Sequence, residues 1–156
     1  EARARGTNLE LRLIGPTDAN PSSIAPIILR EWDAMDGITV AGPSDDIAGA
    51  YADCHIAALP SYREGLPKVI LEAAAMGRPA ITTDAPGCRD AVVDGETGYL
   101  VPPWNAEALA DRMGKLLQDP DLRETMGKAA RERAEVLFST DRVVADTLAV
   151  YRELLS

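Results

Sequence analysis

Short apolar runs alternate along the chain with segments whose apolar residues recur at helical spacing. Residues 9–15 alternate apolar and polar side chains up to Gly15-Pro16, which is typical of a strand that ends in a turn. Residues 54–60 are apolar almost without a break, as in a strand covered on both faces. The same reasoning predicts further strands over residues 37–41, 79–83 and 98–101.

Helical spacing fills most of the remaining chain. Helices are predicted over residues 21–35, 44–52, 67–76, 89–93 and 105–117. Two more follow, one with Asp119 as its N-cap and Pro120 at its first position, the other opened by Ser139 or Thr140. The apolar stripe of the last helix consists of Val144, Leu148, Tyr151 and Leu155, and it is most simply explained as core.

Strands separated by helical segments indicate βαβ units and a parallel sheet. We therefore expect an α/β fold with a doubly wound, Rossmann-like parallel sheet in a single domain that ends in a helical extension. Ligands of such sheets bind at the carboxyl ends of the strands. The loops of interest are therefore residues 15–20, 42–46, 60–67, 84–88 and 102–105.

Composition and charge narrow the class of protein. The 156 residues are 46% hydrophobic and 26% charged, an ordinary mix for one globular domain. A net charge of −9 argues against a nucleic-acid partner. The chain has two distant cysteines, Cys54 and Cys88, and a single histidine, His55. This set predicts neither a metal site nor a disulfide, and the low cysteine content favours a reducing, cytoplasmic compartment. We expect His55, in an apolar run, to be a structural histidine.

The strongest chemical signal is the loop of residues 60–67, which leads from a strand into a helix. The unpaired amides and the dipole at a helix N-terminus attract phosphate, and Gly65 allows a ligand to approach the backbone. Pro67 is expected in the first helical turn. A tight turn into a helix, with no ligand, explains the same residues.

Glu72 is the one charge in the apolar segment 69–76. It lies about 7–8 Å along the helix from Pro67, within reach of a ribose if a diphosphate sits at the helix end. An arginine partner, or an exposed stripe shared with Lys68, explains Glu72 equally well. Glu64 and Glu72 could form an acid/base pair. We prefer two separate acceptors for hydroxyl groups, which need no tuned pKa.

The segment 60–73, P-S-Y-R-E-G-L-P-K-V-I-L-E-A, resembles the E-x7-E signature of retaining, family 4 glycosyltransferases of the GT-B fold (glycosyl transferases group 1). The resemblance continues through residues 77–84 (G-R-P-A-I-T-T-D), 87–92 (G-C-R-D-A-V) and 94–103 (D-G-E-T-G-Y-L-V-P-P). It covers most of the chain from about Leu9 onward. The E-x7-E pattern alone is weak, whereas the ordered set of blocks is highly specific.

The resemblance implies a role for each matching residue of the loop and helix. Glu72 would hold the ribose hydroxyls, and Glu64 would contact hydroxyls of the donor sugar. The backbone beside the sugar and diphosphate would come from Gly65, Leu66 and Pro67. The donor would be a UDP- or GDP-sugar, transferred with retention of configuration and without a bound metal or other cofactor.

Two further loops are implicated by the same resemblance. The loop Ala41-Gly42-Pro43 would lie beside the base, and Gly15 would face the donor from a strand end. The whole chain, residues 1–156, would be the C-terminal, nucleotide-sugar-binding domain of a two-domain enzyme.

The resemblance is incomplete at the amino end. Family members grip the diphosphate with an Arg and a Lys around the first strand of this domain, and those positions would precede Glu1. The acceptor-binding N-terminal domain would precede it too. Residues 1–6, E-A-R-A-R-G, have the composition of a helix end, so we expect the chain to be a fragment. Because the residues that grip the diphosphate and the acceptor-binding domain would be missing, we expect that the fragment does not catalyse alone. The final helix of this family often crosses to the partner domain.

The acceptor expected by analogy is a saccharide, with a lipid-linked saccharide of surface-polysaccharide synthesis as the leading candidate. The full enzyme would be cytoplasmic, at the inner face of the membrane. Three rival hypotheses remain: a GT-B sugar-nucleotide epimerase, a non-catalytic nucleotide-binding or interaction domain, and a Rossmann-like domain for another ligand. Asp119-Pro120-Asp121 matches a metal-binding Asp-x-Asp pattern, but a helix N-cap with a first-turn acid explains it better.

Overall fold

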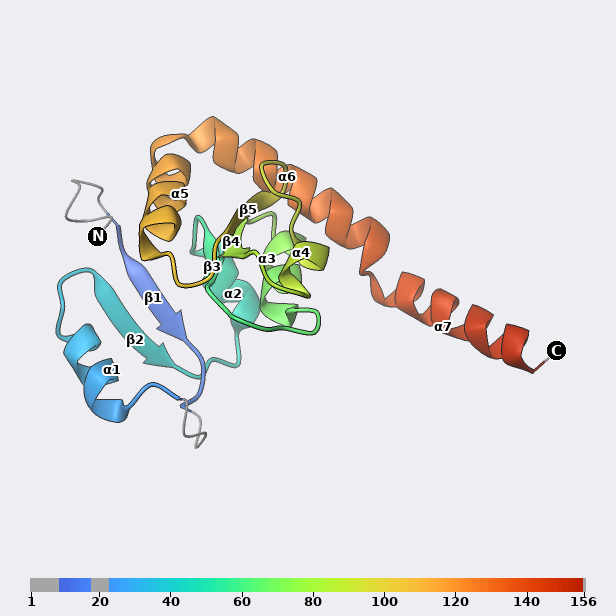
Figure 1. Ribbon diagram of the computed structural model, residues 1–156, viewed down its shortest axis with the longest axis horizontal. Coiled ribbons are helices and arrows are strands. Elements are labelled where there is room, and N and C mark those ends of the chain that lie inside the picture. The colour runs from blue at the N-terminus through green and yellow to red at the C-terminus, as the bar shows by residue number, and fades with distance from the viewer. Residues whose placement is uncertain (1–8, 18–22, 156) are drawn as a thin grey trace.

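The computed structural model describes residues 9–17 and 23–155, in which parallel strands alternate with helices (Figure 1). The expected helix end at residues 1–6 lies outside the described residues. The strands are β1 (Leu11–Ile14), β2 (Ile38–Gly42), β3 (Ala57–Leu59), β4 (Ala80–Thr83) and β5 (Gly98–Val101). The helices are α1 (Pro26–Asp33), α2 (Ile47–Ala52), α3 (Lys68–Ala75), α4 (Cys88–Ala91), α5 (Ala106–Gln118), α6 (Pro120–Leu137) and α7 (Thr140–Leu154).

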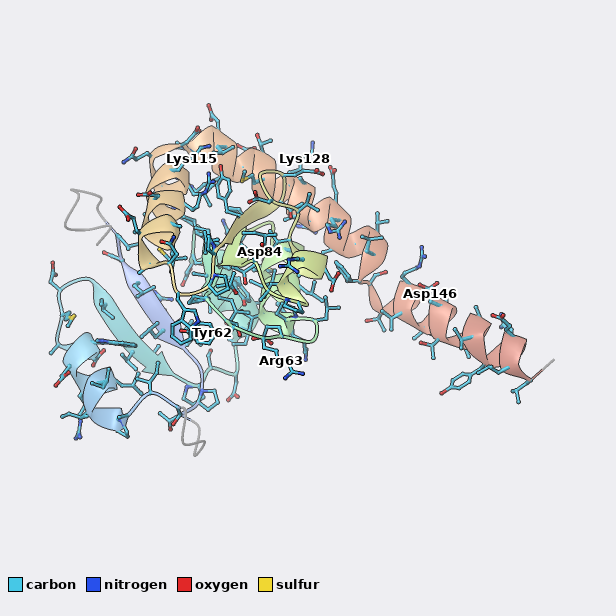
Figure 2. The ribbon with its side chains drawn as sticks, in the orientation of Figure 1. Tyr62, Arg63, Asp84, Lys115, Lys128 and Asp146 are labelled. Atoms are coloured by element: carbon cyan, nitrogen blue, oxygen red, sulfur yellow. The ribbon has the colours of Figure 1, made fainter. Side chains whose placement is uncertain are left out.

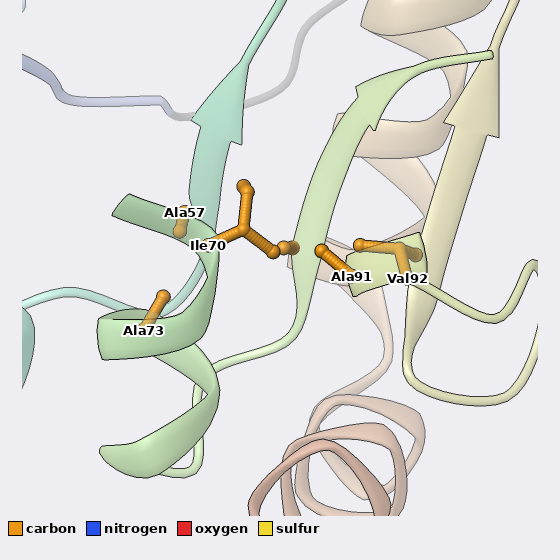
Figure 3. Packing of buried hydrophobic residues seen from close by; sticks show 6 residues of the cluster. Ala57, Ile70, Ala73, Ala91 and Val92 are labelled. Carbon is orange, nitrogen blue, oxygen red and sulfur yellow. The ribbon is translucent and has the colours of Figure 1, made fainter. Parts of the chain in front are cut away.

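The best-packed part of the chain is a three-stranded parallel sheet in the order β3-β4-β5. Every residue of the central strand β4 is buried, because helices cover both of its faces. One face packs against α3 and α4 through a cluster of Ala57, Ile70, Ala73, Ala80, Ala91 and Val92 (Figure 3). The opposite face packs against α5 and α6 through Ile81, Tyr99, Val101, Leu116 and Met126. The doubly wound arrangement is confirmed here.

Small residues allow α6 to lie close to α3. Ala74 of α3 meets Ala130 and Ala134 of α6 in a separate buried cluster. A side chain at Gly127 would approach the Gly77 carbonyl oxygen to 2.1 Å, so only glycine fits there.

The first two strands form a separate parallel sheet, with Leu11 opposite Ile38 and Leu13 opposite Val40. The α/β class is confirmed, but the expected single sheet is divided, since β1 and β3 are not paired. Figure 1 shows α1 beside this sheet. Half-buried Leu11 and Leu13 alternate with exposed Arg12 and Ile14, so the second face of the sheet has no apolar cover from residues 9–17 and 23–155.

Two expectations about burial are wrong. The strand over residues 54–60 is only Ala57–Leu59, with Ala58 exposed, because β3 is an edge strand and not a central one. His55 precedes this strand and is exposed, so it is not a structural core histidine.

The stripe of the last helix is likewise not core. No residue of α7 is buried, and Val144, Leu148 and Tyr151 are exposed. The helix extends away from the sheets beyond α6, so no second layer reaches it (Figure 1). Among the described helices, none combines the length and apolar character that crossing a bilayer requires.

Candidate functional site

The predicted strand–loop–helix unit is present, and buried threonines of β4 fix its first part. Thr82 Oγ1 donates a hydrogen bond to the Leu59 carbonyl oxygen at 2.7 Å. Thr83 Oγ1 donates to the carbonyl oxygen of Ser61, at the start of the loop. Both threonines are buried, so these bonds satisfy hydroxyl groups that would otherwise be costly to bury. Sequence reasoning missed both residues, because a strand of small residues gave no sign of which hydroxyls would pair.

A second loop packs against the middle of this unit. Gly87, the N-cap of α4, has a φ of 79°, and a side chain there would lie 2.1 Å from the Gly65 carbonyl oxygen and 2.5 Å from that of Glu64. Only glycine combines this conformation with this close approach. On the side where a Cβ of Gly65 would point, nothing lies within 4 Å. The backbone at Gly65 therefore packs against Gly87 on one side and is open on the other, which leaves room for a ligand to approach it.

The N-terminus of α3 has no side-chain cap. Pro67 is the N-cap, one position before the first helical turn where it was expected. Its carbonyl oxygen accepts from the amides of Ile70 and Leu71, at 3.0 and 3.2 Å. The amides of Lys68 and Val69 have no acceptor among the residues that the structure describes. Two free amides at the positive end of a helix dipole form a suitable site for a phosphate group.

Glu72 lies in the second turn of α3 and is half-buried. Within residues 9–17 and 23–155, its carboxylate has neither a hydrogen bond nor an ion pair, so the expected alternative of an arginine partner is not observed. Tyr51 lies nearby, and its hydroxyl donates to the Val69 carbonyl oxygen at 2.7 Å. Burial, and secondly the negative charge of Glu72, raise the pKa of Tyr51 to about 12. The tyrosine therefore stays protonated beside the carboxylate and leaves the carboxylate oxygens available to a ligand.

Glu64 comes from the loop and not from the helix, as predicted. It is half-buried, and its carboxylate also has no ionic or hydrogen-bonding partner in the described part of the chain. The unit thus offers two free amides followed by two unpartnered carboxylates. Amides at a helix end bind phosphate oxygens, and carboxylates accept hydrogen bonds from sugar hydroxyls.

The remaining predicted residues lie at the carboxyl ends of β1 and β2. The Gly15 amide donates to the Gly42 carbonyl oxygen at 2.9 Å, and Gly42 has a φ of 68°. Ala41 and Pro43 line a cavity of about 410 Å³ in front of α2. Glu64 and Glu72 do not line this cavity. The predicted site residues therefore lie in two groups, one at each sheet, and this cavity belongs to the first group alone.

An aromatic pair at the loop after β3 was not predicted. Tyr62, which is labelled in Figure 2, stacks on Trp104 of the loop after β5. The ring centroids lie 3.9 Å apart, at an interplanar angle of 16°. Trp104 has a φ of 64° and is, among the described residues, the one non-glycine in the left-handed region. That conformation costs roughly 1–2 kcal/mol, and a stacked pair returns about 0.5–1.5 kcal/mol. The sequence shows Trp104 only as a loop residue, and neither partner nor φ can be read from it.

The described residues contain no cluster of three or more potential His, Cys, Asp or Glu metal ligands. Asp119 is the N-cap of α6, and its carboxylate accepts from the Leu122 amide at 2.9 Å. The Asp-x-Asp pattern therefore has the structural explanation that the sequence favoured. Near the loops, Arg89 donates a hydrogen bond to Asp84 and thereby lowers the pKa of that carboxyl group.

The chain is similar to proteins of a known family. Residues 1–119 match the family model of glycosyl transferases group 1. The chain is 32% identical over 152 residues to the capsular polysaccharide biosynthesis glycosyltransferase CapM of Staphylococcus aureus, covering 97% of this chain and 40% of CapM. It is 33% identical over 122 residues to the N,N'-diacetylbacillosaminyl-diphospho-undecaprenol alpha-1,3-N-acetylgalactosaminyltransferase of Campylobacter jejuni, covering 78% of this chain and 31% of that enzyme.

A solved structure agrees with these matches. Sucrose-phosphate synthase from Thermosynechococcus elongatus superposes with a TM-score of 0.87 at 33% identity, covering 99% of this chain and 40% of that one. The chain thus spans about two fifths of the length of CapM and of the synthase. The family model covers most of the chain, including every predicted site residue, and the chain belongs to the glycosyl transferases group 1 family.

Proposed function

We propose that this chain is the nucleotide-sugar-binding domain of a glycosyltransferase that transfers a sugar from a UDP- or GDP-sugar with retention of configuration. The observation that carries the proposal is Glu72, a half-buried carboxylate without a partner in the described chain, one helical turn beyond the free amides of α3. Its free oxygens can accept hydrogen bonds from a ligand that carries suitable donors. Ribose hydroxyls beside a bound diphosphate supply them.

The proposed roles follow the order of the binding groups along the strand–loop–helix unit from β3 to α3. The free amides and the dipole of α3 hold the diphosphate, and the backbone of Leu66 and Pro67 lies beside it. The same amides and dipole stabilise the negative charge that the diphosphate gains as it leaves the sugar. Glu64 binds hydroxyls of the donor sugar beside the open Gly65. The base lies by Ala41, Gly42 and Pro43. The protein contributes orientation and electrostatics, and we propose that it needs neither a metal nor another cofactor.

The whole enzyme needs more than this domain. The chain spans 40% of CapM, so we propose that a preceding N-terminal domain binds the acceptor. The names of CapM and of the Campylobacter jejuni transferase support a saccharide acceptor, and the latter name supports a lipid-linked one. Such an enzyme works at the cytoplasmic face of the bacterial membrane. We expect negligible sugar transfer by this chain alone, and robust turnover by the purified chain would contradict that expectation.

The proposal is tested by ligand-observed NMR with UDP, GDP, ADP and NAD, on the chain and on its Glu72→Ala variant. We expect weak binding of UDP or GDP, which also identifies the base. Losing a hydrogen bond to a charged group costs about 1.5–3 kcal/mol, so Glu72→Ala should weaken binding about 10–100-fold.

The matched control is Glu132→Ala, which removes an exposed carboxylate from α6 and should leave binding unchanged. Preferential NAD binding would favour a Rossmann-like domain for another ligand. Nucleotide binding that Glu72→Ala does not alter would remove Glu72 from the site.

A further inference from the structure

We propose that Trp104 is a positioning residue that holds the Glu64 loop in its sugar-binding conformation by stacking on Tyr62. The inference rests on the proposed function, because it concerns the donor-sugar end of that site. The two rings come from the loops after β3 and β5, the strands that flank β4 in the sheet.

Core packing does not explain this pair. Trp104 is 82% exposed and Tyr62 is 53% exposed, so neither ring fills a cavity. The indole also requires a left-handed backbone that a bulky residue rarely adopts, with a φ of 64°. Strained, exposed residues of this kind persist at functional sites, where a fixed conformation is useful in itself.

The position of Tyr62 within its loop shows what the stack controls. The carbonyl oxygen of Ser61, on one side, is held by Thr83. The carbonyl groups of Glu64 and Gly65, on the other side, pack against Gly87. The stretch between these two anchors is Tyr62 and Arg63. A hydrogen bond of 3.4 Å from the Ser61 hydroxyl to the Arg63 carbonyl oxygen holds its backbone, and the stack on Trp104 holds the Tyr62 side chain. Figure 2 shows the side chains of Tyr62 and Arg63 on this loop.

A loop held in one conformation binds its ligand without first being ordered. If the competent conformation falls to about a tenth of the population, the apparent affinity falls about tenfold. Because Glu64 is assigned to the sugar and Glu72 to the ribose, losing the stack should weaken binding of the sugar moiety and not of the nucleoside diphosphate.

The test compares Trp104→Gly, which removes both the ring and the backbone strain, with Trp104→Phe, which keeps a ring for stacking. Titrations use UDP-glucose, UDP-N-acetylglucosamine and GDP-mannose, each against its sugar-free diphosphate. We expect Trp104→Gly to lower the affinity for the best-bound sugar nucleotide about tenfold and to leave the affinity for the corresponding diphosphate unchanged. Trp104→Phe should restore most of the lost affinity. Tyr151→Ala, which removes an exposed ring from α7, is the matched control.

Equal weakening of both ligands, or of neither, would overturn the inference. A second readout needs no ligand: the NMR amide signals of Glu64 and Gly65 should shift or broaden in Trp104→Gly and return towards the parent in Trp104→Phe. If the parent binds no nucleotide, the proposed function fails, and these amide signals alone decide whether Trp104 positions the loop. Signals that match the parent in Trp104→Gly would overturn that role.

Discussion

The β1–β2 unit and the β3–α6 unit are built from the same kind of sequence, parallel strands joined by helices, yet their packing differs. Every buried hydrophobic residue of the described chain lies between Ala57 and Ala134. The described residues before Ala57 are half-buried at most. The difference comes from the neighbours of each sheet. Helices cover both faces of β3-β4-β5. In the part of the chain that the structure describes, the β1-β2 sheet, with Arg12 and Ile14 exposed, lacks such cover on its second face.

The comparison also bears on the site. The carboxylates Glu64 and Glu72 belong to the well-packed unit, where two threonines and Gly87 hold the loop. The proposed base loop, Ala41-Gly42-Pro43, belongs to the two-stranded sheet, and isolated two-stranded sheets are only marginally stable. The part proposed to bind the sugar and diphosphate is therefore held more firmly than the part proposed to bind the base.

The largest expected loss of stability is found by comparing one apolar position from each sheet. Ile81 of β4 is fully buried, so Ile81→Ala should cost about 2–5 kcal/mol of unfolding free energy. Leu13 of β1 is half-buried, so Leu13→Ala should cost about 1 kcal/mol. Urea denaturation measures both values, and equal losses would show that the two units are packed alike.

The next effect tests the close contact within the well-packed unit. Gly127→Ala should cost about 1–3 kcal/mol, because the new methyl group meets the Gly77 carbonyl oxygen. Lys128→Ala, at the adjacent exposed position of α6, should be nearly neutral and serves as the control. If Gly127→Ala is equally neutral in thermal or urea unfolding, the α3–α6 contact is looser than described.

A smaller effect concerns Tyr51 of α2, whose hydroxyl donates a hydrogen bond to α3 of the β3–α6 unit. Tyr51→Phe removes the hydrogen bond to Val69 and should cost about 1 kcal/mol at neutral pH. The pKa of Tyr51 is raised to about 12 from 10.0, so the unfolded phenol loses its proton first. The stabilising contribution is complete below pH 10 and lost as pH rises towards 12. Alkaline urea titrations should show this loss in the parent and not in the Phe variant.

The smallest effect lies on the surface of the well-packed unit. The hydrogen bond from Arg89 lowers the pKa of Asp84, so Arg89→Ala should raise that pKa towards its ordinary 3.8. The folded pKa is depressed, so the stabilising contribution is present above the ordinary value and is lost as pH falls through the folded one. NMR titration of the Asp84 carboxyl group measures the shift. Arg131→Ala, which breaks the Arg131–Glu135 pair of α6, should leave Asp84 unchanged.

Much of the site was predictable, because its signals are local. The loop before α3 and the separate origins of Glu64 and Glu72 follow from a short run of sequence and are confirmed. Their roles in binding stay predictions. The Tyr62–Trp104 stack and the contact of Gly87 with Gly65 were not predictable, because each joins loops more than twenty residues apart in the sequence.

The sequence by itself determined the order of strands and helices and the starts of the helices that a side chain caps. The helix expected over residues 21–35, which has no such cap, begins only at Pro26. Asp46, Asn105, Asp119 and Ser139 each accept a hydrogen bond from the amide three residues on, as expected of N-caps. Capping and periodicity act within a few residues, so the local sequence specifies them. Burial was decided by the tertiary structure: the division of the sheet, the exposed edge at Ala58 and the uncovered stripe of α7. An apolar residue becomes core only where another element covers it, and that depends on distant parts of the chain.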